Sequence, residues 1–166
     1  MPLPELCTDR LVLRPFTTED VDLLHAMWTD PEVRRYLWDD IVISRDRALQ
    51  VVQSHLASVA TAGIGYWIVQ TAAGNEAIGF CGFRFIDSGP EVELMYGLLP
   101  RHWGCGLATE ASRAALDYLW RNTSFTRAWA RTDPPNAKSV EVMRRLGMRH
   151  VSSTANMISY ICEKQD

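Results

Sequence analysis

The stretch from Pro90 to Leu119 constrains the fold of this chain most, because it predicts a strand, a glycine turn and a long helix in succession. The strand runs from residue 91 to residue 99, and Pro100 ends it, since proline offers no amide hydrogen to a neighbouring strand. Gly104 and Gly106 form the turn. Apolar residues then recur at helical spacing: Leu107, Ala108, Ala111, Ala115, Tyr118 and Leu119.

A strand that turns into a helix through glycines directs several unpaired backbone amides at one point. With the positive end of the helix dipole, these amides favour phosphate oxygens. Glycine is needed where a side chain would block the anion or the required backbone angle. Two glycines before a helix are also common as ordinary turn residues, so the pattern predicts a phosphate site only with support from its neighbours.

The neighbouring residues supply that support. The run WGCGLATEA at residues 103–111 resembles the pyrophosphate loop of the GNAT superfamily of N-acetyltransferases, whose general pattern is Q/R-x-x-G-x-G/A. Trp103 departs from its first position, but the run is similar to the branch of ribosomal-protein-alanine N-acetyltransferases. The resemblance implies that acetyl-CoA is bound through backbone amides of the following residues: Gly104, Cys105, Gly106, Leu107, Ala108 and Thr109.

A second run, NAKS at residues 136–139 with LGM at 146–148, resembles the other cofactor motif of the same family. The resemblance implies that Asn136 bonds the pantetheine arm of acetyl-CoA and that Ser139 lies near its sulfur. Without the resemblance, Asn136 is equally well explained as a helix cap, and Ser139 as a solvent-facing helix residue.

The resemblance also implies direct attack of an amine on the acetyl thioester, which requires a deprotonated amine, a polarised carbonyl and a stabilised thiolate. The strand before the turn would splay from its neighbour, and the backbone of Tyr96, Gly97 and Leu98 would hold the pantetheine and the acetyl group. Gly97 is typical of a bulge or a close backbone approach, although packing under a bulky neighbour explains it too.

The acid that protonates the thiolate is less clearly indicated. Many relatives place a tyrosine seven residues after the motif asparagine and a glutamate five residues before it, where this chain has Met143 and Arg131. Ser139 therefore becomes the candidate acid or thiolate partner, with Tyr96 and Tyr160 as alternatives.

Glu93 is the predicted catalytic base, acting directly or through a water, because it lies close to the expected acetyl group. Strand alternation places Glu91 and Glu93 on one side of the strand. The alternative to a catalytic role is therefore that both side chains face solvent. An amine that loses its proton to bulk water needs no dedicated base.

The remaining pattern predicts a mixed α/β fold, with a mostly antiparallel central sheet flanked by helices, in a single N-acetyltransferase domain over residues 1–166. The order of elements is also that of the family. Strands are predicted at residues 9–16, 66–71, 77–86, 91–99, 127–132, 148–152 and 157–162, and helices at 18–28, 31–37, 44–61, 107–119 and 136–146.

Composition excludes several other classes of protein. A net charge of -3 argues against bulk nucleic-acid binding and against a polybasic membrane surface. The four cysteines have no metal-ligand spacing, so no metal site is expected: Cys7, Cys81, Cys105 and Cys162. Scattered thiols, no secretory leader pattern and no run long enough to span a bilayer predict a cytoplasmic protein.

The predicted function is transfer of acetyl from acetyl-CoA to a primary amine, on a protein N-terminus or a small amino compound. Trp28, Tyr36 and Trp38 are candidates for the acceptor cleft, and Asp39 and Asp40 would add an acidic rim suited to a cationic amine. Core packing and solvent exposure explain these residues equally well.

The residues are also compatible with two other functions and with a homodimer. A non-catalytic acyl-CoA-binding or sensing module is the alternative, because the usual tyrosine and glutamate are absent. A nucleotide-phosphate enzyme is disfavoured, since no Lys-Ser/Thr follows the glycines. An exposed strand at residues 157–162 would permit a homodimer through edge pairing.

Overall fold

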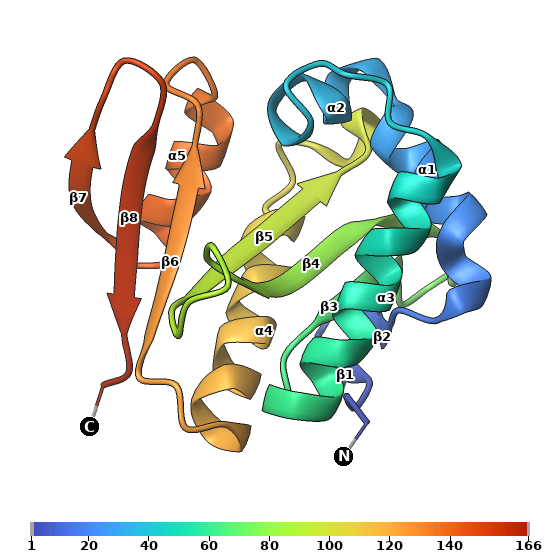
Figure 1. Cartoon of the computed structure of the whole chain (residues 1–166), viewed down its shortest axis with the longest axis horizontal. Helices are drawn as coiled ribbons and strands as arrows, with labels where there is room; N and C mark the ends of the chain where they lie inside the picture. Colours follow the sequence, from blue (N-terminus) through green and yellow to red (C-terminus); the bar gives the residue numbers. More distant parts are fainter. Residues whose placement is uncertain (1, 166) are drawn as a thin grey trace.

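The computed structural model describes residues 2–165, and a mixed sheet of eight strands forms its centre, in the order β1-β2-β3-β4-β5-β6-β8-β7 (Figure 1). Neighbouring strands are antiparallel except β5 and β6, which are parallel. The strands are β1 Leu6–Cys7, β2 Leu11–Pro15, β3 Tyr66–Thr71, β4 Ala77–Phe85, β5 Val92–Leu98, β6 Arg127–Thr132, β7 Arg149–Ser153 and β8 Ile158–Glu163.

Helices cover both faces of the sheet. Helices α1, α2 and α3 pack on one face, while α4 runs behind the opposite face and α5 lies beside β6 (Figure 1). The helices are α1 Val21–Thr29, α2 Pro31–Leu37, α3 Arg45–Ala62, α4 Leu107–Asn122 and α5 Ala137–Arg145. The predicted mixed α/β architecture is therefore confirmed.

Local capping explains where the first helices begin and end. Asp30 accepts hydrogen bonds from the amides of Glu32 and Val33 at the start of α2, whose first residue is proline. Ser44 caps α3 through the amide of Arg47. Gly63 ends α3 in the left-handed conformation, with φ of 66°. These signals are local in the sequence, so the predicted boundaries agree closely with the observed ones.

Alternation along the central strands divides the apolar side chains between two cores. On β4, Phe80 packs with helices α1–α3, whereas Cys81 and Phe83 pack with α4. On β5, Met95 joins the first core and Leu94 the second. Both cores contain fully buried residues, so β4 and β5 are packed on both faces and hold the residues at their ends rigidly.

The parallel strands β5 and β6 separate along their length. They share one registered pair, Glu93 opposite Trp129, and then diverge toward their carboxyl ends (Figure 1). This is the splay that the family resemblance implies. It leaves the carboxyl half of β5 without a hydrogen-bonded neighbour on the β6 side, where a ligand can reach the backbone.

Two sequence-based expectations need correction or extension. The strand predicted at residues 157–162 is β8, which lies between β6 and β7 and is therefore no free edge; on that side of the sheet the edge strand is β7. The proposed basis for edge-paired dimers at residues 157–162 is wrong.

The short strand β1 was not predicted. Within residues 2–165, no helix is both long and apolar enough to cross a membrane.

Candidate active site

The turn between β5 and α4 has the geometry of an anion-binding loop. Gly104 and Gly106 have φ of 74° and 77°, a region that other residues rarely adopt. A Cβ on Gly104 would meet nothing within 4 Å, so the conformation and not crowding requires glycine there. The Glu110 amide bonds the Gly106 carbonyl at 3.0 Å, which leaves the amides of residues 107–109, in the first turn of α4, without carbonyl partners in the helix.

Side chains hold this loop from outside. The indole Nε1 of Trp103 donates to the Leu98 carbonyl at 2.7 Å, and the Lys138 ammonium lies 4.1 Å from the centre of a Trp103 ring. Arg10 donates to the Cys105 carbonyl at 2.9 Å and pairs with Glu110. Trp103 thus anchors the loop to the end of β5, a role that explains a tryptophan at this position.

A cleft of about 830 Å³, the loop cleft, extends from these amides between β5 and α5. It is lined by every residue predicted to bind the cofactor except Cys105, whose exposed side chain lies outside. Thr109 lines the cleft, and its buried hydroxyl has no hydrogen-bond partner among the described residues. Cationic side chains in the lining outnumber the acidic Glu32 and Glu141: Arg35, Arg131, Lys138 and Arg145.

These features fit coenzyme A. Free amides at a helix N-terminus, an unpartnered hydroxyl beside them and cationic walls all suit a pyrophosphate. Asn136 also lines the cleft and caps α5: its Oδ1 accepts from the Ser139 amide at 3.3 Å, and its Nδ2 donates to Thr132 at 3.0 Å. Asn136 is thus a helix cap that lies at the wall of the cleft, so the two sequence interpretations are compatible.

Tyr96 and Ser139 meet across the loop cleft. The Tyr96 hydroxyl lies 2.9 Å from both the carbonyl oxygen and the Oγ of Ser139, which links β5 to α5. Burial raises the pKa of Tyr96 above its usual value, so the phenol stays protonated. Tyr160, the other predicted alternative, is buried beside Met143 and His150 and does not line the cleft.

Gly97 packs under an aromatic ring. The β4–β5 pairing passes it without a register shift, and a Cβ on Gly97 would lie 2.7 Å from Cε1 of Phe80. A bulge, one of the two predictions for Gly97, is therefore wrong, and the packing alternative holds. The residue still lines the loop cleft, so its backbone remains within reach of a bound ligand.

A second cavity, of about 670 Å³, lies on the face covered by α1–α3; we call it the aromatic cavity. It shares Leu37, Phe80 and Met95 with the loop cleft, so the two cavities adjoin at these three residues. Its aromatic lining consists of Trp28, Trp38, Tyr66, Phe80, Phe83 and Phe85. The predicted acceptor residues thus divide: Trp28 and Trp38 line this cavity, while Tyr36 lines the loop cleft.

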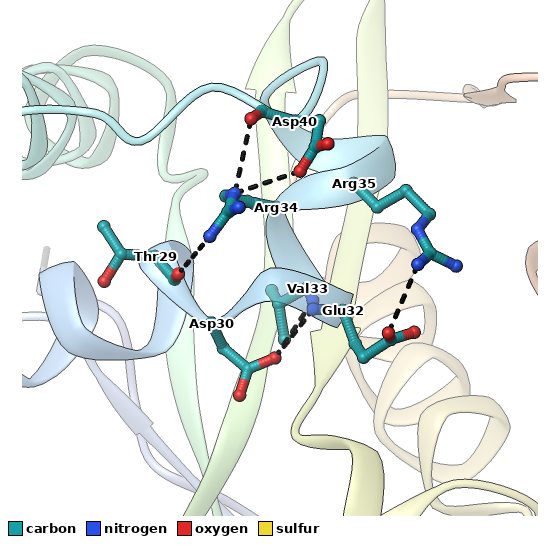
Figure 2. A network of polar contacts seen from close by, with 7 residues as sticks. All are labelled: Thr29, Asp30, Glu32, Val33, Arg34, Arg35 and Asp40. Atoms are coloured by element: carbon teal, nitrogen blue, oxygen red, sulfur yellow. Dashed lines mark hydrogen bonds and ion pairs between the residues drawn. The ribbon is translucent and has the colours of Figure 1, made fainter.

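The segment that carries these residues is fixed by polar contacts around α2 (Figure 2). Arg34 donates to the Thr29 carbonyl at 3.1 Å and to Asp40 at 3.0 Å, and Arg35 pairs with Glu32 at 3.3 Å. Asp40, which has a left-handed φ of 59°, is thereby held on Arg34.

The predicted acidic rim is not formed. Neither Asp39 nor Asp40 lines either of the two cavities. The aromatic cavity is instead lined by Arg47 and Arg84, with one carboxylate, Asp87.

Glu93 is placed differently from its predicted role. Its side chain is only 2% exposed, and both carboxylate oxygens accept hydrogen bonds from arginines: from Arg84 at 2.8 Å and from Arg131 at 2.7 and 3.2 Å. Glu93 lines neither cavity. This geometry argues against Glu93 as a base, because its lone pairs are already occupied by cations. The solvent-facing alternative is also wrong, since the residue is buried.

Sequence reasoning did not foresee several polar side chains at the cavities. Thr109 was predicted only for its backbone amide, and Arg47 and Arg84 were not named because they belong to no motif. Only the alternation of β4, with Arg84 in an otherwise apolar strand, gave a signal for one of them. No group of three or more acidic, histidine or cysteine side chains suited to a metal was found in the described part of the chain.

Comparison with known proteins agrees with this geometry. A family profile described as "Acetyltransferase (GNAT) domain" matches residues 10–149. The uncharacterized N-acetyltransferase p20 of Bacillus licheniformis is 32% identical over 149 residues, which cover 87% of this chain and 82% of that protein.

Solved structures show the same fold. An acetyltransferase from Agrobacterium tumefaciens str. C58 superposes with a TM-score of 0.86 at 24% identity, covering 99% of this chain and 96% of that one. RimL, a ribosomal L7/L12 alpha-N-protein acetyltransferase in complex with coenzyme A, gives 0.81 at 18% identity, with coverage of 96% and 98%. These two likenesses show the fold, and the profile together with the p20 match shows that the chain belongs to the GNAT family of acetyl-CoA-dependent N-acetyltransferases.

Proposed function

We propose that this chain, as a single domain over residues 1–166, transfers acetyl from acetyl-CoA directly to a primary amine. The acceptor is the α-amine of a protein N-terminus or the amine of a small amino compound. The meeting of the two cavities at Leu37, Phe80 and Met95 carries this proposal. A thioester reached through the loop cleft and an amine in the aromatic cavity would face one another there.

The residues of the loop cleft have complementary roles toward acetyl-CoA. The amides of residues 104–109 and the Thr109 hydroxyl bind the pyrophosphate, and the Lys138 ammonium adds charge at the rim. Asn136 bonds the pantetheine arm, and the backbone of Tyr96, Gly97 and Leu98, which has no registered strand partner on the β6 side, orients the pantetheine and the acetyl carbonyl. This assignment is supported by the splay of β5 from β6 and by the lining of the cleft.

The Tyr96–Ser139 pair is the proposed partner of the leaving thiolate. When the amine nitrogen attacks the carbonyl carbon, the carbon–sulfur bond breaks and the sulfur takes a proton. The Ser139 hydroxyl, 2.9 Å from the Tyr96 hydroxyl in the lining of the cleft, gives a proton to that sulfur and is reprotonated from water, while the attacking nitrogen releases its own proton to water. The high pKa of Tyr96 favours its hydrogen-bonding role over a negative charge.

The proton of the amine is proposed to leave to water, since Glu93 is occupied by two arginines. Because the amine must lose its proton before it attacks, the rate should rise with pH until the amine is fully deprotonated.

The four cysteines are free thiols, which supports a reducing, cytoplasmic setting. The fold likeness to RimL supports a protein N-terminus as one acceptor class.

Calorimetric titration of acetyl-CoA, with ATP and NAD as parallel ligands, tests the cofactor assignment. Selective binding of acetyl-CoA is expected, followed by thiol release when amines are added. Binding of ATP or NAD in its place would overturn the role of residues 103–109. Binding of acetyl-CoA without thiol release for any amine would favour a sensing module over an enzyme.

A further inference from the structure

The aromatic cavity has a charge opposite to the one expected for a site that binds only a cationic amine. Two guanidinium groups line it, those of Arg47 and Arg84, against the single carboxylate of Asp87. Arg47 lies 5.7 Å from the centre of a Trp38 ring and donates to Gln50 at 3.1 Å, so it is held against the wall. An acceptor that enters this cavity meets cationic donors.

Arg84 is the better placed of these donors, because a buried carboxylate fixes it. Arg84 on β4 lies directly opposite Glu93 on β5 in the antiparallel register, and its Nε and Nη2 both contact one carboxylate oxygen of Glu93, at 2.8 and 2.7 Å. Arg131 contacts the same carboxylate through its own Nε and Nη2. Three neighbouring strands therefore hold the three side chains rigidly.

This arrangement leaves part of each guanidinium available. A guanidinium that binds a carboxylate along its Nε–Nη2 edge keeps its Nη1 and the outer hydrogen of Nη2 for a second acceptor. Two arginines on one glutamate also leave a net charge of +1. The Arg84 side chain is 50% exposed and lines the aromatic cavity, whereas the Glu93 side chain is 2% exposed. Arg84 thus presents a fixed, free edge to the cavity.

Other donors in the same wall are unused. Among the residues that the structure describes, the buried indole N–H groups of Trp28 and Trp38 have no acceptor. Both residues line the aromatic cavity, and their rings meet edge to face at 5.9 Å. Buried donors without acceptors are costly, and a ligand oxygen that reached either N–H would remove this cost.

We propose that the acceptor is a primary amine that also carries a carboxylate, namely an amino acid or an amino-acid-like small molecule with an apolar body, and that Arg84 binds its carboxylate. Glu93 and Arg131 act as positioning residues for Arg84. The inference rests on the proposed acetyl transfer and narrows its acceptor. A protein N-terminus is the disfavoured class, because its first residue carries an uncharged amide carbonyl where a free amino acid carries its carboxylate.

Matched acids and amides test this inference. The acceptors are L-phenylalanine against L-phenylalaninamide and 6-aminohexanoate against 6-aminohexanamide, assayed by thiol release from acetyl-CoA. For at least one pair we expect kcat/KM to be at least about tenfold higher for the acid, the size of a charge-assisted hydrogen-bond pair. Arg84→Gln should remove this preference through the acceptor KM, and Arg84→Lys should restore part of it, since lysine keeps the charge without the planar edge.

Arg127→Gln is the matched control. Arg127 lies on the same strand as Arg131 and pairs with Glu91 at 2.9 Å, but it lines neither cavity. Its substitution should leave the ratio of acid to amide unchanged. Arg84→Gln keeps the Arg131–Glu93 pair, so the variant retains a partner for the buried carboxylate.

The outcomes separate this inference from the proposed function. Equal kcat/KM for acid and amide in both pairs, or faster turnover of the amides, overturns the carboxylate site while acetyl transfer stands. If no amine releases thiol, the proposed acetyl transfer is wrong. Calorimetric titration of L-phenylalanine and L-phenylalaninamide into the protein saturated with coenzyme A then still tests whether Arg84 binds a carboxylate. Binding of the acid no tighter than the amide, or no binding of either, overturns it.

Discussion

The loop cleft and the aromatic cavity are built from different parts of the chain. The loop cleft consists largely of backbone: amides 104–109, the unpaired half of β5 and the capped start of α5. The aromatic cavity is lined by side chains from helices α1–α3, strands β3–β5 and the turn after β4. A site built from backbone groups keeps its ligand specificity when side chains are substituted, whereas the specificity of a site built from side chains depends on those side chains. A shared co-substrate and a variable acceptor match this division.

Gly106→Glu gives the largest expected effect and acts on the loop cleft alone. It places a side chain and a negative charge where phosphate oxygens would lie, at a residue with φ of 77°. We expect acetyl-CoA affinity to fall about 1,000-fold or more, about 4 kcal/mol, in calorimetric titration. Gly147→Glu is the matched control, because Gly147 has the same φ of 77° and open space around it, but lies outside the cleft. Equal losses in both variants would mean that backbone strain and not the phosphate site is responsible.

Acidification should act on the aromatic cavity first. His55 lines that cavity, and burial lowers its pKa from 6.5 to about 4. Its Nδ1 accepts the Tyr66 amide at 2.8 Å, and the nearby acid Asp20 is already bonded to Arg14. Because the unfolded chain binds the proton more readily, the stabilisation is present above pH 6.5 and is lost as pH falls toward 4.

The measurement is urea unfolding across this window. The loss attributed to His55 amounts to about 3 kcal/mol over the full range, at about 1.4 kcal/mol per pKa unit. His55→Gln keeps an oxygen acceptor for the Tyr66 amide and should flatten the dependence between pH 6.5 and 4. A variant as acid-sensitive as the wild type would show that other groups cause the loss.

The same division explains what the sequence predicted. Caps, turns and strand alternation are local, so the bounds of β3, β6 and α2 follow directly from Asp30-Pro31 and similar signals. The pyrophosphate loop is also a contiguous run. By contrast, the geometry that argues against Glu93 as a base could not be predicted, because it comes from Arg84 and Arg131, 9 and 38 residues away. No local pattern states which strand lies beside which.

The edge of the sheet shows the same limit. The alternation at residues 157–162 is equally compatible with an edge and an interior strand, and only the sheet order places β8 between β6 and β7. The side of the sheet on which Trp28 and Trp38 pack, and the arginines they meet, likewise depend on how α1–α3 settle on β4. Sequence reasoning therefore found the residues of one cavity and only part of the other.

Glu93→Gln distinguishes a base from a positioning residue. Loss of the buried negative charge leaves two arginines facing each other, which we expect to destabilise the fold by about 2 kcal/mol, less than a fully buried pair because Arg84 is half exposed. The acceptor KM should rise while the shape of the pH–rate profile persists. Glu91→Gln is the control, since Glu91 accepts hydrogen bonds from Arg127 and Trp129 outside both cavities. Loss of one limb of the profile with an unchanged acceptor KM would restore Glu93 as the base.

Trp103→Phe is the smallest of these effects and tests whether the loop cleft depends on any side chain. The variant keeps an aromatic ring for Lys138 but loses the hydrogen bond to the Leu98 carbonyl, which is 2.7 Å long. We expect acetyl-CoA affinity to fall about fivefold, about 1 kcal/mol, with little change in the acceptor KM. Trp129→Phe removes a comparable indole bond, to Glu91 at 3.0 Å, outside both cavities and should leave cofactor affinity unchanged. If Trp103→Phe binds acetyl-CoA as tightly as the wild type, the glycines and the helix end alone define the loop. Cofactor binding would then depend on backbone alone, in contrast to acceptor binding, which depends on the side chains of the aromatic cavity.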